Sequence, residues 1–226
     1  MAYYLAFDGA DDKVTCPQVS FSNGATITIK LTATWIADSD TKIVSVRATG
    51  NSCTILIGPQ SDGRIRLYAR DSSYNSVVLF SPYGLDDGLP HDIIATINTD
   101  TGLSSFKVDG VEDSAVSTAM TNFSAAPANF GIGYEVGRTN NNPSCDIYSL
   151  EVFVDSVRVR FYNPAITSSG LTLPEDESAQ DGTLVNFPTD DSQWVFYSSG
   201  PNTPVNLNPS ITNLLATSAR LNWEQG

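Results

Sequence analysis

The chain of 226 residues has three cysteines and one histidine, and these small numbers exclude several kinds of site. Cys16, Cys53 and Cys145 lie far apart and lack the paired spacing of zinc sites. Because their number is odd, a complete disulfide framework is excluded, and we expect buried thiols. The single histidine, His91, is the only base that a Ser–His–Asp hydrolase could use. It stands at the start of a predicted strand, where a structural hydrogen bond is the better interpretation.

Positive charge and long apolar runs are also scarce. The chain has 12 Lys and Arg against 25 Asp and Glu, a formal net charge of −13, so nucleic acid and anionic membranes are unfavourable partners. No run approaches the roughly 18 apolar residues of a membrane span, so we expect no membrane insertion. Met1 to Tyr4 lead directly into a predicted strand, without the basic and apolar regions of a signal peptide. If Met1 is the native start, a cytosolic location, assembly into a virion and export by a C-terminal or leaderless route are open; we expect a virion, extracellular or cell-surface location without a standard signal peptide.

Alternation of apolar and polar side chains is the main pattern that the sequence does contain. Residues 26–35 are apolar at every odd position, ending with Trp35, and Thr or Lys at every even position. A repeat of two over ten residues predicts a half-buried antiparallel strand and fits no helix. Further strands are predicted near residues 3–7, 12–16, 42–48, 53–58, 64–69, 76–80, 91–98, 103–108, 129–133, 145–154, 158–162 and 194–197. No segment shows a convincing amphipathic helix.

Five different short motifs occur one after another along the chain. They are F-D-G-A-D-D-K-V from Phe7, P-H-D-I-I-A-T-I from Pro90, F-K-V-D-G-V from Phe106, F-G-I-G from Phe130 and S-C-D-I-Y-S-L-E-V-F from Ser144. In this order they resemble the concanavalin A-like lectin/glucanase superfamily, in its laminin-G-like and pentraxin-like branch. The tryptophan that usually precedes the histidine of the second motif is absent. The resemblance covers residues 3–200 and implies an all-β, two-sheet antiparallel jelly-roll sandwich in which strand 3–7 lies beside strand 145–154.

The last part of the chain has a different character. We predict a concanavalin A-like domain over residues 1–200 and a linker at 201–205, which is rich in proline, asparagine and threonine. Residues 206–226 resemble the first two strands of a fibronectin type III domain, with Trp223 as its core tryptophan. Such a domain needs about 100 residues, so the segment would be only its beginning. The alternative is a tail that docks on the main domain.

Three aspartates within five positions mark the first predicted turn. Asp8, Asp11 and Asp12 offer hard oxygen ligands of the kind that calcium prefers. The resemblance implies further ligands from paired acids on the late strand, but Tyr148 and Ser149 stand there, and Asp146 is the candidate replacement. The alternative is an Asx turn, in which the aspartates bond their own backbone. Calcium is therefore a candidate cofactor.

Two polar loops have the composition of sugar-binding loops. Sugar binding needs an aromatic face and a few well-placed polar groups. One candidate loop holds Tyr74, with Tyr83 in the loop that follows the next strand. The other runs from residue 134 to 143, and its candidate ligand-binding residues are Arg138, Asn140, Asn141 and Asn142. The alternative for both is an ordinary solvated loop.

These features predict a non-catalytic carbohydrate-binding or adhesion module of a larger modular protein, such as a phage tail or receptor-binding protein or a bacterial adhesin. Its expected partners are a cell-surface glycan or polysaccharide and neighbouring domains. One alternative is a structural spacer without a ligand. Another is a glycoside hydrolase, which needs two carboxylates about 5–9.5 Å apart. Glu151 and Asp155 share a strand face, but Phe153 replaces the acid that resembling laminarinases carry between them, so we expect no enzyme.

Overall fold

The computed structural model describes most of the first 197 residues. The described ranges are 2–38, 41–48, 53–116, 120, 123, 125–138, 142–167, 169–176 and 180–197, and the side chains of 2, 114–116 and 125–127 are excepted. The predicted linker at 201–205 and the fibronectin-like segment at 206–226 lie outside the described residues. Within the described part, the regular structure consists of strands and one short 3₁₀ turn, η2 (Pro164–Ile166). The all-β class is confirmed.

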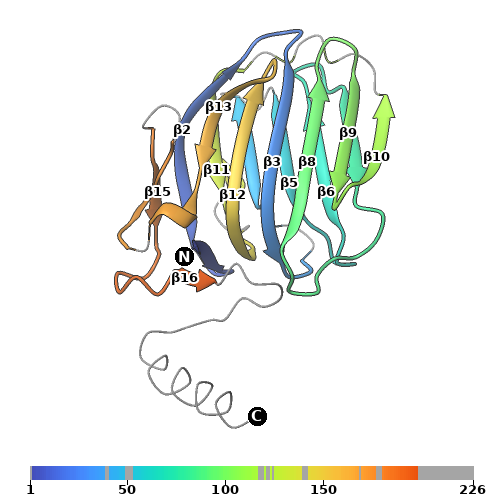
Figure 1. Cartoon of the computed structure of the whole chain (residues 1–226). Helices are drawn as coiled ribbons and strands as arrows, with labels where there is room; N and C mark the ends of the chain where they lie inside the picture. Colours follow the sequence, from blue (N-terminus) through green and yellow to red (C-terminus); the bar gives the residue numbers. More distant parts are fainter. Residues whose placement is uncertain are drawn as a thin grey trace.

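Two antiparallel sheets pack face to face (Figure 1). Sheet A has the order β10 (Val111–Val116), β9 (Leu103–Val108), β8 (His91–Asn98), β3 (Thr26–Trp35), β12 (Ser144–Val154), β1 (Ala2–Asp8) and β16 (Trp194–Tyr197), and β13 (Val157–Tyr162) also pairs with β12. Sheet B has the order β14 (Thr172–Leu173), β15 (Gly182–Val185), β2 (Lys13–Phe21), β11 (Ala125–Ile132), β4 (Val44–Ala48), β5 (Thr54–Pro59), β6 (Ile65–Arg70) and β7 (Ser76–Phe80). The jelly-roll sandwich expected from the sequence is thus observed.

Segments from opposite ends of the sequence meet in sheet A. Leu5 of β1 lies opposite Ile147 of β12, which confirms the predicted contact between these two strands. The other edge of β1 pairs with β16, where Ala2 lies opposite Tyr197. Figure 1 accordingly shows the N-terminus beside β16. This edge of sheet A therefore forms by pairing of the first and the last described strands, β1 and β16.

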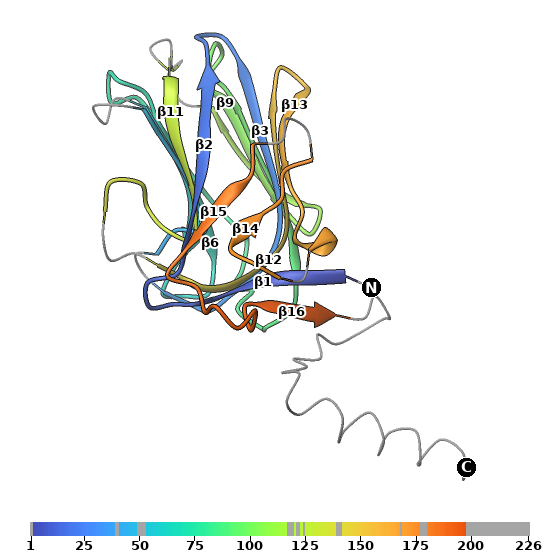
Figure 2. The same cartoon turned by 90° about the vertical axis from the view of Figure 1, so that its left-hand side faces the viewer.

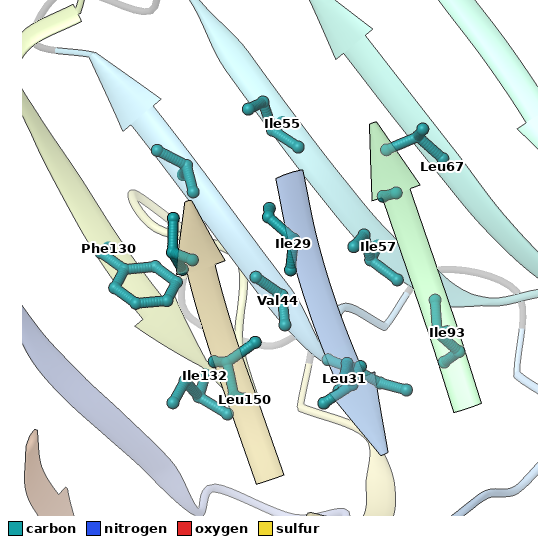
Figure 3. Packing of buried hydrophobic residues seen from close by; sticks show 14 of the residues in the cluster. Ile29, Leu31, Val44, Ile55, Ile57, Leu67, Ile93, Phe130, Ile132 and Leu150 are labelled. Atoms are coloured by element: carbon teal, nitrogen blue, oxygen red, sulfur yellow. The ribbon is translucent and has the colours of Figure 1, made fainter. Parts of the chain in front are cut away.

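The core lies between the two inner faces, where apolar side chains interdigitate (Figure 3). Ile29 and Leu31 of β3 face Val44 of β4 and Ile55 and Ile57 of β5, and each of the five is at most 2% exposed. Full burial of such a side chain stabilises the fold by about 1.5–3 kcal/mol. The period-two pattern of residues 26–35 is thus the inner face of a central strand.

Pro17 accounts for a difference between the predicted and observed strands. A strand was predicted near residues 12–16, and Pro17, which follows it, cannot donate to a sheet ladder. The structure continues β2 to Phe21, with an irregular register at this point: Cys16 lies opposite Phe130 and Val19 lies opposite Ala128. Pro17 and Gln18 thus share one partner position, and this β-bulge accommodates the proline. Strands β10, β14 and β15 were not predicted from the sequence.

No helix of the described part is long and apolar enough to cross a membrane.

Candidate functional site

A hollow of about 330 Å³ lies on the outer face of sheet B. Strands β4, β5 and β6 form its floor, and the segment after β11 forms one wall. Nine residues line it: Lys42, Arg47, Thr54, Leu56, Arg66, Tyr68, Arg70, Glu135 and Arg138. Its volume falls at the lower end of the ~300–1,000 Å³ typical of small-molecule sites.

Strand register explains why these side chains gather. Thr54 of β5 lies between Arg47 of β4 and Arg70 of β6, and in the next row Leu56 lies opposite Tyr68. Alternate residues of a strand face the same side, so residues 66, 68 and 70 of β6 all project outward. The alternation that buries Ile65, Leu67 and Ala69 in the core therefore places two arginines and a tyrosine in one outward row.

The wall of the hollow is held firmly against β4. The Ser45 hydroxyl donates to the Tyr134 carbonyl (2.8 Å) and accepts from the Val136 N–H (3.0 Å). Arg47 Nη1 donates to the Val136 carbonyl at 2.9 Å. Figure 2 shows the segment after β11 standing out from the outer side of sheet B. These bonds fix the position of Glu135 and Arg138 before any ligand binds.

Charges in the hollow are unbalanced. Its only carboxylate among the described lining residues is that of Glu135, which is buried. Glu135 Oε1 lies 3.3 Å from Arg47 Nη1 and 3.1 Å from Arg138 Nε, so it pairs with two arginines at once. Lys42 is also buried, and its Nζ donates to the Thr41 carbonyl at 3.0 Å. Five cationic side chains thus surround one carboxylate.

In the lining, the hydroxyl oxygen of Thr54 and Nε of Arg47 are buried without a hydrogen-bond partner among the described residues. Thr54 is only 4% exposed. A buried polar group that lacks a partner costs about 1–3 kcal/mol. The floor of the hollow therefore offers hydrogen-bonding capacity that the described protein groups leave unused.

Of the residues predicted from the sequence, Arg138 lines this hollow and Tyr74 contacts one of its lining residues. The Arg70 guanidinium, a lining group, lies over the Tyr74 ring. Tyr74 stands in a tight turn and is 76% exposed. The buried Asp71 carboxylate holds this turn by accepting from the N–H groups of Ser73 and Asn75, both at 2.9 Å.

The other predicted sugar-binding residues lie elsewhere. Tyr83 is exposed beyond the far end of β7, and β6 spans about 17 Å between the end near Tyr83 and the turn of Tyr74. Asn142 is buried, and its Nδ2 donates to the Asp12 carbonyl at 2.7 Å, so its amide braces the backbone and is not presented to solvent. Asn140 and Asn141 lie outside the described residues.

The predicted acidic corner forms a compact group. One carboxylate oxygen from each of Asp8, Asp11 and Asp12 lies within 4.8 Å of the others. Burial raises the pKa of Asp12 to about 6, and the charges of Asp8 and Asp11 add to this effect against the hydrogen bond from the Asp8 N–H. A cation would relieve this crowding of oxygens, so the donor set suits a hard metal ion such as calcium.

Asx bonds also stabilise the same corner. The Ala10 N–H donates to Asp8 Oδ1 (2.7 Å) and the Asp8 N–H donates to Asp12 Oδ2 (3.0 Å), as in the alternative interpretation. Asp146 does not join the group. Its Oδ2 accepts from the Thr34 hydroxyl at 3.0 Å, and burial raises its pKa to about 6. The structure therefore brings together three of the four predicted metal ligands.

The residues considered for catalysis are engaged in structural contacts. His91 packs against Trp35, and its two ring nitrogens contact Asp109 (2.6 Å) and Asp87 (3.0 Å), as expected for a structural histidine. Burial lowers the pKa of His91, but the bonds to the two aspartates outweigh burial and raise it overall. Glu151 pairs with Arg158 at 3.0 Å, and Asp155 Oδ1 accepts from the Thr26 N–H at 2.8 Å.

Sequence reasoning missed most residues of the hollow. Lys42, Arg47, Arg66 and Tyr68 were not singled out, whereas Arg70 and Glu135 fell within the candidate loops 70–76 and 134–143 but were not named as ligand-binding residues. A signal was present in I-R-L-Y-A-R at 65–70, where the polar positions of a predicted strand hold two arginines and a tyrosine. Arg47 could not be added to that row without the strand order, since β4 and β6 are separated by β5.

No protein-family model and no curated protein sequence matches the chain. Solved structures share its fold. A protein of Bacteroides ovatus described as carbohydrate-binding is 11% identical, with a TM-score of 0.57 over 80% of this chain and 57% of that one. Domains LG4-5 of the mouse laminin α1 chain are 16% identical, with a TM-score of 0.55 over 70% of this chain and 42% of that one. A pentraxin of Limulus polyphemus is 14% identical, with a TM-score of 0.48 over 65% and 77%. The two structures with TM-scores above 0.5 thus share the two-sheet antiparallel sandwich fold of this chain.

Proposed function

We propose that the sandwich is a non-catalytic carbohydrate-binding module and that the hollow on sheet B is its glycan site. The observation that carries the proposal is the hollow itself, in which Tyr68 and several guanidinium groups converge on a rigid strand floor. A tyrosine ring offers an apolar face to a sugar, and guanidinium groups offer planar sets of donors. The similar fold of the B. ovatus protein described as carbohydrate-binding supports the same function.

The chemistry of the hollow favours binding over hydrolysis. Glycoside hydrolysis uses two carboxylates that flank the scissile bond. The described lining contains one, Glu135, and this carboxylate already pairs with Arg47 and Arg138. Incubation of the protein with each glycan that it binds should release no reducing sugar and no unsaturated product. Release of either product would overturn the non-catalytic assignment.

A glycan array tests the function directly. We expect the protein to bind at least one glycan, and we expect Tyr68→Ala to weaken that binding at an unchanged fold. Lys107→Ala is the matched control, since Lys107 lies on β9 of sheet A, away from the hollow. If no glycan binds across neutral and acidic arrays, the alternative of a structural spacer without a ligand replaces this proposal.

We also propose that Asp8, Asp11 and Asp12 bind calcium, at a site separate from the hollow. The proposal is supported by the close approach of three carboxylates and the raised pKa of Asp12. When bound, the ion would neutralise the acidic corner and hold the turn between β1 and β2. Asn186 supports this turn as well, because its Nδ2 donates to the Asp11 carbonyl at 3.1 Å.

For the biological setting, we propose a modular surface protein such as a phage tail protein or bacterial adhesin, acting in a virion or at the cell surface. Support comes from the sequence alone: a linker-like segment at 201–205 precedes a fibronectin-like segment at 206–226. Immunogold labelling of virions or cells that produce the protein would test it. Label confined to the cell interior would overturn the proposal.

A further inference from the structure

The distribution of positive charge is the most unusual feature of this surface. The whole chain carries a net charge of −13, yet five of its 12 lysines and arginines line a single hollow of nine residues. Glu135 supplies the only carboxylate among the described residues of that lining. A concentration of cations within an acidic protein requires a local reason. A negatively charged ligand group provides one.

We propose that the hollow binds an anionic sugar, one that carries a carboxylate or a sulfate group; this inference rests on the proposed function and names its ligand class. Guanidinium groups pair with carboxylate and sulfate oxygens through two parallel hydrogen bonds, which are stronger than bonds between neutral groups. A neutral sugar has hydroxyl groups alone and cannot form such paired, charged hydrogen bonds.

Arg66 is the residue best placed to contact the acid group. Glu135 pairs with Arg47 and Arg138, whereas no carboxylate of the described residues lies within ion-pair distance of Arg66. Arg66 lies opposite Gly58, over which Thr41 and Lys42 pack, and it is two residues from Tyr68 on the same face of β6. An acid group on Arg66 would therefore place the sugar ring toward Tyr68 in the middle of the floor.

Unused hydrogen-bonding capacity marks the rest of the ligand position. The Thr54 hydroxyl oxygen and Arg47 Nε are buried without a partner among the described residues, and both belong to the lining. Thr54 lies directly opposite Arg47 across the β4–β5 ladder. A sugar hydroxyl, which both donates and accepts, satisfies such a pair of groups. Contacts to an acid group and to a sugar hydroxyl together favour a charged sugar over a simple anion.

The charge of the remaining surface argues for a sugar acid over nucleic acid. Surface charges act over about 8–10 Å at physiological ionic strength. A long polyphosphate chain that left the hollow would cross a strongly acidic protein. A glycan that carries an acid group on only some of its residues can seat one such group among the arginines while its neutral residues meet the surrounding surface.

Polymers that differ only in charge test the proposal. Polygalacturonate and its fully methyl-esterified form share one backbone, as do dextran sulfate and dextran, and a single-stranded oligonucleotide provides the phosphate comparison. We expect binding to polygalacturonate or dextran sulfate, which identifies the acid group, with no binding to the neutral partner and weakening as salt is raised. Equal binding of charged and neutral polymers overturns the inference and leaves the proposed function standing. Absence of binding to any glycan overturns both.

Substitutions locate the binding. Arg66→Gln and Arg138→Gln should each raise Kd for the charged polymer by about tenfold or more, as expected for loss of a charged hydrogen bond. Arg158→Gln, on β13 of the other sheet, is the matched control and should leave Kd unchanged. Thermal melting and circular dichroism establish that the variants fold. An equal rise in Kd in all three variants would refute an anionic-sugar site. So would an oligonucleotide that binds as tightly as the charged polymer and loses its binding in Arg66→Gln.

Discussion

The guanidinium carbon of Arg70 lies 4.9 Å from the centroid of the Tyr74 ring. A cation–π contact of this kind contributes about 0.5–1 kcal/mol at an exposed site. Because Arg70 lines the hollow while Tyr74 stands outside it, the ring restricts the arginine at the rim. Tyr74, an exposed residue of a turn, is thus linked to the candidate site through its contact with Arg70.

Replacing Tyr74 should separate its binding role from its structural cost. Tyr74 has φ = 68°, a left-handed conformation that costs most residues about 1 kcal/mol or more and glycine almost nothing. Tyr74→Gly should therefore keep or raise Tm, while Kd for a bound glycan increases. Tyr83→Gly, at the other end of the sheet, should leave Kd unchanged. Unaltered Kd in Tyr74→Gly would exclude Tyr74 and its hold on Arg70 from binding.

Calcium should stabilise the folded protein. A ligand that binds only the native state adds about 2.7 kcal/mol at 100 times its Kd, so Tm should rise in millimolar calcium and return after a chelator is added. Asp11→Asn should abolish the rise, because it removes one of the three carboxylates. Asp100→Asn, at an exposed turn of sheet A, should retain it. Identical melting curves with calcium and chelator would identify the corner as an Asx turn alone.

Stability should depend on pH through His91. Its pKa is raised in the folded state above the value of about 6.5 expected in the unfolded chain. Below pH 6.5 His91 is protonated in both the folded and the unfolded chain, and its contacts with Asp87 and Asp109 stabilise the fold fully. As the pH rises through the folded-state pKa of His91, this contribution is lost. Tm of the parent should therefore fall across that window. His91→Gln should flatten the fall, and a parallel fall in the variant would assign it to other groups.

Gly133 should tolerate no side chain. It has φ = +76°, and a Cβ there would lie 2.2 Å from Cε1 of the Phe7 ring. Gly133→Ala should cost about 1–2 kcal/mol from the left-handed conformation and about 1–3 kcal/mol more from overpacking. Gly110→Ala is the control: φ is +81° and nothing lies within 4 Å, so only the first cost applies. Urea unfolding that gives equal losses for both would show that Phe7 moves aside freely.

The sequence predicted strands best where one face is buried. The bounds 26–35 match β3, and burial alternates as predicted except at Thr34, which is buried as well, because alternation distinguishes core from surface there. Strand β15 was missed, since Gly182, Thr183, Leu184 and Val185 are too few to show a period. The end of β2 was placed too early, before Pro17, where a β-bulge accommodates the residue that lacks a backbone N–H. Local pattern therefore predicts long central strands and fails at short edges and bulges.

The candidate site was less predictable, for a geometric reason. Tyr74 and Arg138 were identified from loop composition; Arg138 lines the hollow, and Tyr74 lies outside it in contact with the lining residue Arg70. Arg47, Arg66 and Arg70 belong to strands, where single polar residues look like ordinary solvated positions. They meet because β4, β5 and β6 are adjacent in sheet B, a fact of strand order and register that one sequence does not contain.

The pairing of β1 with β16 has a mechanical consequence. Ala2 lies opposite Tyr197 at the outer edge of sheet A, so the two ends of the sandwich are about 5 Å apart and leave on the same side. A force that pulls these ends apart loads the β1–β16 ladder one hydrogen bond at a time, as in opening a zipper, and does not shear all the bonds together. The last strand should then peel away at low force. The hollow lies on the other sheet, so a ligand held there would feel little of that tension.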